Sequence, residues 1–581
     1  MLRAFRVRPI QSCLRRLIRT ESNNLGWEDI KTIRANQWPV LKGEATAEKT
    51  ILAKSHYLKK RLVNTVPKCF IMIYKNWMGS FCFDRVHNDD WSGEMQRACR
   101  FGTNLIQITI GEEFMDENYQ GNPAGFIHPH GMLHGLLTAD EIDRGSVVIS
   151  SKIYSHQRNG HAYSPQQLQK MVDLSLNQMG VDVLDMLTLE IPPFITESQL
   201  AIALYHIRSE ITSGRIKYLT LGGTFPFTAE GFNPMNGKKK TNEFVDVSQF
   251  SFSFVTLMRM VNDVGLMDKL IGIQVPLNIS EATMATVPVK PDYLDLLAEY
   301  MKTSPDTSMT LLDVMKQCDL AVFADRCFEG YQDQRPVRLL DFQPIDQTNL
   351  LTDMKESFEI CRYMEDVYRK KIRPSVKDLP EGHVPLPDPD SFQFGFILPT
   401  VMLQVESLMV WEDLRYTAIE PSLREGINQL AGISEEVKKW CFSYRLAVTN
   451  MLDYITKAFK AKEIGYIEEV NKEVEKLVPV YANKDIRFYY KMLDSMLSLG
   501  VTSVMTDMIH IHSNDVNPPL LSKEECLRFL SSFKMPKDNV HLISMQDYAY
   551  RTEEHDLKTM HEKVSYYDEA YSETPDLKKE Q

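Results

Sequence analysis

Short apolar, β-branched runs alternate with helical patterns over residues 79–330. The runs predict strands over residues 104–110, 146–154, 183–191, 216–223, 271–277 and 320–326. The first helical pattern opens with Ser164-Pro165 and closes at Gly180, as a capped helix does, and the next one ends at Gly214. Repeated β-α segments predict a parallel sheet, and this many in series predict a closed eight-stranded barrel.

The pattern changes after residue 330. Residues 331–485 are mostly helical, with a proline-rich break over 373–390, and residues 433–478 predict two or three amphipathic helices. Residues 489–509 then return to a helix followed by a strand. The expected organisation is a transit peptide (1–20), an N-terminal extension (21–78), barrel strands one to seven (79–330), a helical insertion (331–485), a return to the barrel with strand eight and a C-terminal helix (486–550), and a charged tail (551–581).

Composition narrows the class of protein. The chain has 581 residues, of which 43% are hydrophobic and 25% charged, which is typical of a globular protein. No run reaches 18 uninterrupted apolar residues, so we expect no membrane span. The nine cysteines are scattered and form no C-x-x-C pair, which predicts small buried side chains instead of a disulfide frame or a zinc site.

The first twenty residues differ from the rest of the chain. They contain six arginines, no lysine and no acidic residue, among scattered apolar positions. This pattern predicts a mitochondrial transit peptide and hence a matrix location; the alternative is a basic surface arm. The whole chain carries a net charge of −12, and without these arginines the remainder is still more acidic. We therefore expect no direct contact with nucleic acid.

Two histidine groups raise the question of a metal. His128, His130 and His134 lie within seven residues, and His510 and His512 form a second pair. Zinc is one interpretation. No carboxylate or cysteine completes either set, so ordinary loop histidines are the interpretation we prefer, and no metal is expected.

Five segments, taken together and in order, are similar to one enzyme superfamily. They are residues 149–193 (ISSKIY…EIPP), 200–223 (LAIALYHIRSEITSGRIKYLTLGG), 270–281 (LIGIQVPLNISE), 310–330 (TLLDVMKQCDLAVFADRCFEG) and 496–508 (MLSLGVTSVMTDM). They resemble strands and helices of the aldo/keto reductases, over about 79–330 and 486–535. The resemblance implies an α/β fold, a (β/α)8 TIM barrel of aldo/keto reductase type, with the mainly helical insertion after strand seven.

The resemblance also implies a reaction and its residues. Aldo/keto reductases transfer hydride from NADPH to a carbonyl, using an aspartate, a tyrosine, a lysine and a histidine. Lys152 stands at the lysine position, Glu190 at the histidine, Gln107 at the aspartate and Glu112 at the tyrosine. Steroid 5β-reductases of this superfamily also carry a glutamate at the histidine position, but they keep the other three residues. A tyrosine donor shifted to Tyr119 stays open.

Several of the residues with which the family binds its cofactor are also replaced. Gln274 fits the glutamine of strand six, but Gly222 and Gly223 stand where the family has the Ser-Asn pair that holds the nicotinamide amide. After strand eight, Asp507 and residues 508–515 offer no arginine or lysine for the 2′-phosphate of NADP. We therefore expect no cofactor, with NADP as the alternative.

Two functions are consistent with the sequence. The first is a catalytically degenerate barrel, kept as a structural or adaptor subunit of a larger mitochondrial assembly, of ribosomal or respiratory-chain type, that binds other mitochondrial proteins through its helical insertion. The second is a divergent NADP-dependent oxidoreductase that reduces a carbonyl substrate. In either case parallel strands should bring Lys152, Glu190, Gly222, Gln274 and Asp325 to one mouth. Because a lone buried ammonium is costly, Lys152 should pair with Glu190 or Glu112.

Overall fold

The chain divides into two units in a computed structural model. The structure describes residues 40–50, 63–65, 72–74, 80–83, 104–110, 143–154, 163–192, 195–223, 253–332, 335–376, 387, 391–430, 433–483, 486–506 and 520–537. The barrel unit lies within Met1–Phe328 and Tyr490–Phe533, and the helical unit within Glu329–Tyr489 and Lys534–Gln581.

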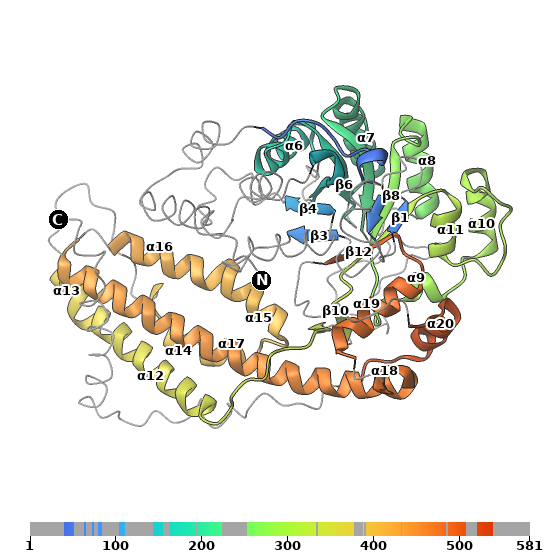
Figure 1. Cartoon of the computed structure of the whole chain (residues 1–581). Helices are drawn as coiled ribbons and strands as arrows, with labels where there is room; N and C mark the ends of the chain where they lie inside the picture. The colour runs from blue at the N-terminus through green and yellow to red at the C-terminus, as the bar shows by residue number, and fades with distance from the viewer. Residues whose placement is uncertain are drawn as a thin grey trace, which may run out of the picture. The chain divides into compact units, whose positions relative to one another are not determined.

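Parallel strands form the centre of the barrel unit (Figure 1). In chain order they are β3 (Ser80–Phe83), β4 (Leu105–Ile110), β5 (Val148–Ile153), β6 (Leu184–Glu190), β7 (Ile216–Gly222), β8 (Leu270–Pro276), β9 (Ala321–Asp325) and β12 (Ser503–Thr506). Each pairs in parallel with the next, and β12 pairs with both β9 and β3, which closes the barrel. The α/β class and the parallel sheet predicted from the sequence are confirmed.

Helices connect the strands of this unit. They are α6 (Pro165–Met179), α7 (Glu197–Thr212), α8 (Phe254–Val264), α9 (Thr283–Thr286), α10 (Pro291–Leu297), α11 (Leu311–Gln317), α19 (Phe488–Ser498, whose first two residues belong to the helical unit) and α20 (Lys523–Ser532). Helix α6 has the predicted ends: the Ser164 side chain accepts a hydrogen bond from the Gln167 N–H, and Gly180 adopts a left-handed φ of 63°. The six strands predicted with limits, β4 to β9, likewise begin and end within two residues of those limits.

The barrel interior has an apolar floor. Every second side chain of each strand points inward. The buried cluster at the floor contains Leu105, Val148, Met186, Ile271, Ala321, Phe323 and Met505, together with Ala45. Gly272 is required here because a Cβ would lie 2.7 Å from the Phe323 ring and 2.9 Å from the Ala321 carbonyl oxygen.

Residues 40–50 are joined to this floor. The Ala45 N–H donates to Asp185 at 2.6 Å, and the Leu41 N–H donates to the Gly180 carbonyl at 2.8 Å. Asp185 is fully buried; burial raises its pKa, against the opposing effects of Arg144 and the two N–H groups that it accepts from. This segment is therefore part of the folded barrel unit.

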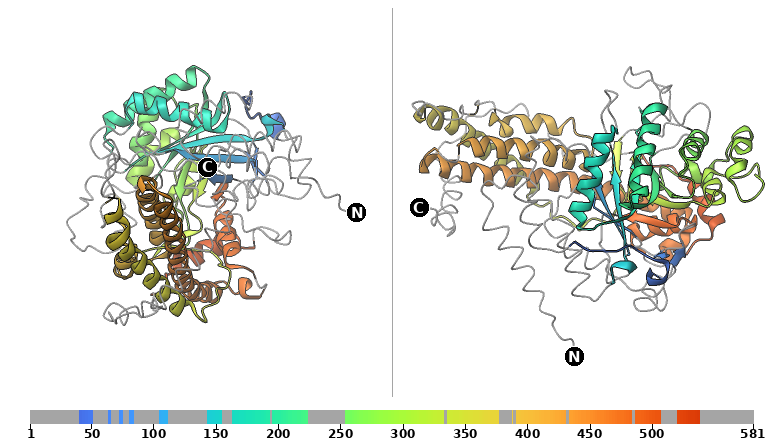
Figure 2. Two further views of the ribbon diagram at one scale, coloured as in Figure 1. Left: turned by 90° about the vertical axis from the view of Figure 1, so that its left-hand side faces the viewer. Right: turned by 90° about the horizontal axis from the view of Figure 1, so that it is seen from above.

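The helical unit starts with a hairpin that the sequence did not predict. Strands β10 (Glu329–Gln332) and β11 (Arg335–Arg338) pair antiparallel. Its helices are α12 (Leu350–Val367), α13 (Arg373–Ser375), α14 (Phe394–Met402), α15 (Leu408–Leu414), α16 (Glu420–Leu430), α17 (Glu435–Leu477) and α18 (Pro479–Asn483), with π-helical turns at Tyr368–Ile372 and Arg415–Ile419. Figure 2 shows these helices, in yellow to orange, running side by side.

Helix α17 corrects one expectation. The sequence predicted two or three helices over 433–478, but Glu435–Leu477 is one helix of 43 residues. No proline interrupts it, and buried positions continue at spacings of three and four from Val437 to Val474. One face of the segment is buried along its whole length, so a single helix forms. The helix accommodates Gly465, its one glycine.

A buried carboxylate lies among aromatic rings in the core of the helical unit. Tyr368 and Tyr444 both stack on Trp440, with centroids 5.0 and 4.8 Å from it. Glu365 is 0% exposed, and its Oε1 accepts from the Gly395 N–H at 2.8 Å and the Tyr444 hydroxyl at 2.9 Å. Its other oxygen, Oε2, has no hydrogen-bond partner among the described residues. Burial raises the pKa of Glu365 to about 7, although these hydrogen bonds act in the opposite direction.

Two further expectations concern cysteines and membranes. Cys318, Cys327, Cys361, Cys441 and Cys526 are free and buried, as predicted. Among the residues that the structure describes, none of the helices has the length and apolar character needed to cross a bilayer.

The buried Glu365 predicts a pH dependence of stability. Its pKa is raised in the folded chain, so the native state holds the proton more tightly than the unfolded state. Stability should fall as pH rises from about 4.5 to about 7, by roughly 3 kcal/mol. Glu365→Gln should remove this component, which thermal melts at pH 5.5 and pH 8 would measure. Equal pH dependence in the wild type and the variant would contradict it.

Candidate functional site

Lys152 is the centre of a charge cluster at the carboxyl ends of the barrel strands. Its Nζ lies 2.8 Å from Asp325 Oδ2, on β9, and 3.2 Å from Glu190 Oε2, on β6. The side chains of the three residues are only 14–23% exposed. The contact with Asp325 is a hydrogen bond, whereas Glu190 is within ion-pair distance and its Oε2 accepts no hydrogen bond from the part of the chain that the structure describes. Asp325 is therefore the principal counter-charge of Lys152.

Asp325 is held by more than Lys152. Its Oδ2 also accepts from Gln274 Nε2 at 2.9 Å, and its Oδ1 accepts from the Arg326 N–H at 3.0 Å. Burial alone would raise the pKa of Asp325, but the Lys152 ammonium, the charge of Arg326 and the Gln274 amide together hold it below its usual value. This carboxylate is therefore a fixed negative charge at neutral pH.

Beneath the charges lies a layer of neutral polar side chains. Gln107 Nε2 is within 3.1 Å of Ser150 Oγ, Thr188 Oγ1 and Gln274 Oε1, and Gln107 Oε1 accepts from Gln274 Nε2 at 3.1 Å. Thr188 is hydrogen-bonded in turn to Thr220. The two glutamines, on β4 and β8, thus bridge the interior of the barrel and satisfy each other.

Two glycines make room for Glu190. Gly222 pairs in register with both Glu190 and Gln274. A Cβ on Gly222 would lie 2.5 Å from Glu190 Oε2 and 3.1 Å from Thr188 Cγ2. Gly223 has a φ of +131°, which L side chains rarely adopt. The Glu190 carboxylate therefore fills the space beside β7 that a side chain at 222 would take.

The residues predicted to meet at one mouth of the barrel lie together in the structure. Lys152, Glu190, Gly222, Gln274 and Asp325 do meet at one end of the barrel, and the expected ion pair of Lys152 with Glu190 is present. The sequence missed Asp325 as the nearer counter-charge, although it placed that residue at the mouth. Other expected positions lie outside the described residues: residues 1–20, Glu112, Tyr119, Asp507 and the five histidines of the two groups.

No group of three histidine, cysteine or carboxylate side chains with the arrangement of a metal site occurs among the described residues.

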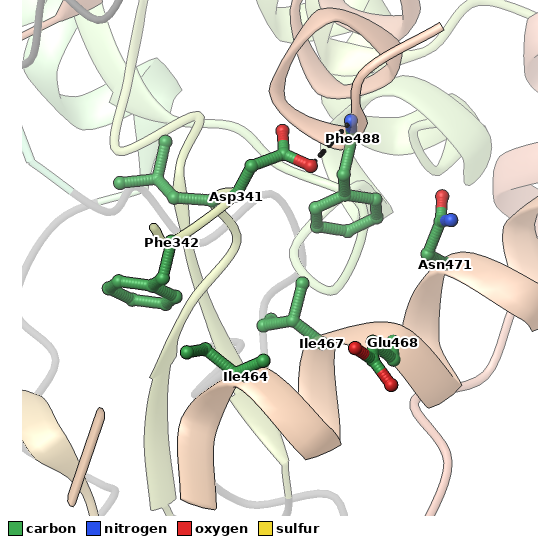
Figure 3. Close-up of a pocket in the computed structure, with 8 residues that line it drawn as sticks. Asp341, Phe342, Ile464, Ile467, Glu468, Asn471 and Phe488 are labelled. Atoms are coloured by element: carbon green, nitrogen blue, oxygen red, sulfur yellow. Dashed lines mark hydrogen bonds between the residues drawn. The ribbon is translucent and has the colours of Figure 1, made fainter. Parts of the chain in front are cut away.

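The helical unit has a pocket of its own (Figure 3). It measures about 130 Å³ and is lined by Leu340, Asp341, Phe342, Ile464, Ile467, Glu468, Asn471 and Phe488. The Asp341 carboxylate accepts from the N–H groups of Phe488 and Tyr489, at 3.1 and 2.9 Å, and so caps the start of α19.

Comparison with known proteins gives structural neighbours only. No protein-family model matches the chain, and no curated protein matches its sequence. Among solved structures, an aldo/keto reductase from Brucella melitensis is 12% identical, with 51% of this chain and 79% of that chain covered and a TM-score of 0.25. The aldose reductase from Schistosoma japonicum is 11% identical, with 43% and 65% covered and a TM-score of 0.26.

The structural neighbours are aldo/keto reductases. A thermostable aldo-keto reductase solved with the inhibitor epalrestat, at 13% identity and a TM-score of 0.26, covers 49% of this chain and 69% of its own. The strand order and register of the barrel unit define its fold independently of these neighbours.

The unequal contacts of the two carboxylates predict unequal effects on stability. Asp325→Asn should lower the free energy of unfolding by about 2 kcal/mol and Glu190→Gln by about 1 kcal/mol. The Asp325 side chain accepts three hydrogen bonds, whereas among the described residues the Glu190 side chain makes only an ion pair with Lys152. Urea unfolding would measure both. Asp319→Asn, in the exposed pair with Lys302, is the control and should change stability by less than about 0.5 kcal/mol. The reverse order of the two effects would refute the assignment.

Proposed function

We propose that this chain is a catalytically degenerate barrel of aldo/keto reductase type, with the helical unit inserted after the seventh strand. It serves as a structural or adaptor subunit of a larger mitochondrial assembly, of ribosomal or respiratory-chain type. The observation that carries the proposal is the position of Lys152 between two carboxylates.

The charge arrangement opposes carbonyl reduction. Hydride transfer to a carbonyl builds negative charge on oxygen, and a reductase site stabilises that charge with donors and cations. Here the Lys152 ammonium already balances Asp325 and Glu190, so it has little stabilisation left for a developing oxyanion. The residue at the histidine position is itself a carboxylate that faces this ammonium. The charged groups at the barrel mouth therefore stabilise one another and not a reacting carbonyl.

The described residues also fit a nicotinamide poorly. Gln274 uses both its amide hydrogens and its oxygen within the protein, with Gln107 and Asp325 as partners. Gly222 and Gly223 have no side chain with which to hold the amide, and the Glu190 carboxylate takes the space beside Gly222. On these grounds we infer that the barrel holds no NADP.

One observation favours the alternative, a divergent NADP-dependent oxidoreductase that reduces a carbonyl substrate. The family's site pairs its lysine with a carboxylate, and Lys152 has such a partner here. The carboxylate comes from Asp325 on β9, because the position on β4 is the neutral Gln107. A donor such as Tyr119 would have to complete such a site.

The exposed apolar side chains of α14 favour a role for the helical unit in binding other proteins. This helix is apolar on two sides: Leu398 and Met402 are buried, whereas Phe396, Ile397 and Leu403 at its end are 42%, 47% and 49% exposed. An exposed apolar cluster of this kind marks interaction sites on soluble proteins. We propose that partner subunits of the assembly contact this face.

The adaptor proposal is tested by titrating the purified protein with NADPH, followed by fluorescence, together with assays on model aldehydes and quinones. We expect no saturable binding below about 1 mM, which corresponds to less than about 4 kcal/mol of binding free energy, and no turnover. Micromolar binding together with turnover that falls in Glu190→Gln, at an unchanged melting temperature, would make Glu190 catalytic and establish the enzyme instead.

Import is tested separately. Residues 1–20 fused to a reporter should direct it to the mitochondrial matrix, because arginine-rich amphipathic segments follow the membrane potential. Glutamate at Arg15, Arg16 and Arg19 should abolish import. The mature N-terminus, read by mass spectrometry of the full chain, should lie before Val40, since the backbone from Leu41 onward is bonded into the barrel floor. Import unchanged by the three glutamates would refute the transit peptide.

A further inference from the structure

The pocket of the helical unit combines an apolar wall with one-sided charge. Four of its lining side chains, Phe342, Ile464, Ile467 and Phe488, are large and apolar, and none of the eight lining residues is basic. Figure 3 shows the two phenylalanine rings and the two isoleucines around the hollow, with Glu468 on the adjacent turn of α17.

The two carboxylates at this pocket are not equivalent. Asp341 is occupied as the cap of α19, where two N–H groups and the positive end of the helix balance its charge. Glu468 lies on the exposed side of α17 and has no ion-pair partner among the described residues. A carboxylate beside an apolar wall attracts a cation more strongly than one surrounded by water, because the wall lowers the local dielectric constant.

The volume restricts what can enter. About 130 Å³ is close to the size of cavities that hold one benzene ring, and it is well below the size of pockets for cofactors. One side chain fits, and it should have an apolar body and a cationic end. Arginine meets both demands, because its planar guanidinium stacks on aromatic faces and pairs with carboxylates.

We infer that this pocket anchors a single arginine side chain from an otherwise apolar segment of a partner protein, with the guanidinium against Glu468 and the methylene stem along Ile464, Ile467 and Phe488. The inference rests on the proposed function, since it supplies one specific contact through which an adaptor would hold its partner. It needs no property of the barrel site.

The test uses the full-length protein and a fluorescein-labelled synthetic peptide with one arginine among leucine and alanine residues. Its partner peptide has citrulline in place of arginine, which keeps the shape and removes the charge. Fluorescence anisotropy should show saturable binding of the arginine peptide, with a dissociation constant of about 10–100 µM. The citrulline peptide should bind at least about 5-fold more weakly, since a charge-assisted hydrogen bond is lost.

Variants separate the pocket from the rest of the acidic surface. Glu468→Gln should weaken the arginine peptide about 5-fold and leave the citrulline peptide unchanged. Glu469→Gln, one residue further along α17 and outside the lining, is the matched control and should change neither. Ile464→Trp should fill the hollow and abolish binding of both peptides.

Three results would overturn the inference: no saturable binding of the arginine peptide, equal binding of the two peptides, or equal effects of Glu468→Gln and Glu469→Gln. Melting temperatures of the variants exclude unfolding as a cause. Failure here leaves the adaptor function standing, because that function is tested by NADPH binding and turnover. Success here together with a working reductase would instead leave the pocket intact and remove the adaptor proposal.

Discussion

Closure of eight parallel strands forces half of their side chains into one shared interior, and this constraint shapes the rest of the barrel unit. Such an interior must be filled, and any polar group inside it must find a partner there. Apolar side chains fill the floor, and the Gln107–Gln274 pair satisfies the polar groups of the middle layer. The Lys152 cluster occupies the mouth. Because Lys152 bonds to Asp325 and Asp325 bonds to Gln274, the middle layer and the mouth form one connected network.

The same network explains how a lysine can lie so deep in the barrel mouth. A buried ammonium without a counter-charge costs several kcal/mol. Asp325 supplies that charge from β9, and the Gln107–Gln274 pair forms a neutral bridge beneath it. Lys152 therefore has a structural part in the barrel mouth that does not depend on any reaction, and the fold alone is no evidence for one.

Strands and caps could be predicted because they depend on local patterns. Runs such as Leu105–Ile110 are buried on both faces, and the Ser164 cap is written in adjacent residues. The ion pair of Lys152 with Glu190 followed from the parallel pairing of β5 with β6. The contact with Asp325 did not follow, because β5 and β9 are not neighbours in the sheet and the lysine reaches across the interior. The β10–β11 hairpin was missed for a similar reason, because its strands pair within the helical unit and no single segment encodes that pairing. The unbroken α17 was missed although its own segment contains no proline and keeps one regularly spaced apolar face.

The order of the strands along the chain has a consequence for biogenesis. Strand β9 ends at Asp325 and its neighbour β12 begins only at Ser503, so seven strands are complete long before the eighth exists. At translation rates of about 5–20 residues per second, the intervening chain takes roughly ten to thirty seconds to emerge. During that time β9 and β3 remain unpaired edges, which are templates for aggregation. The nascent chain should therefore depend on chaperones until the last strand arrives, and truncation before residue 503 should give insoluble protein instead of a smaller folded one.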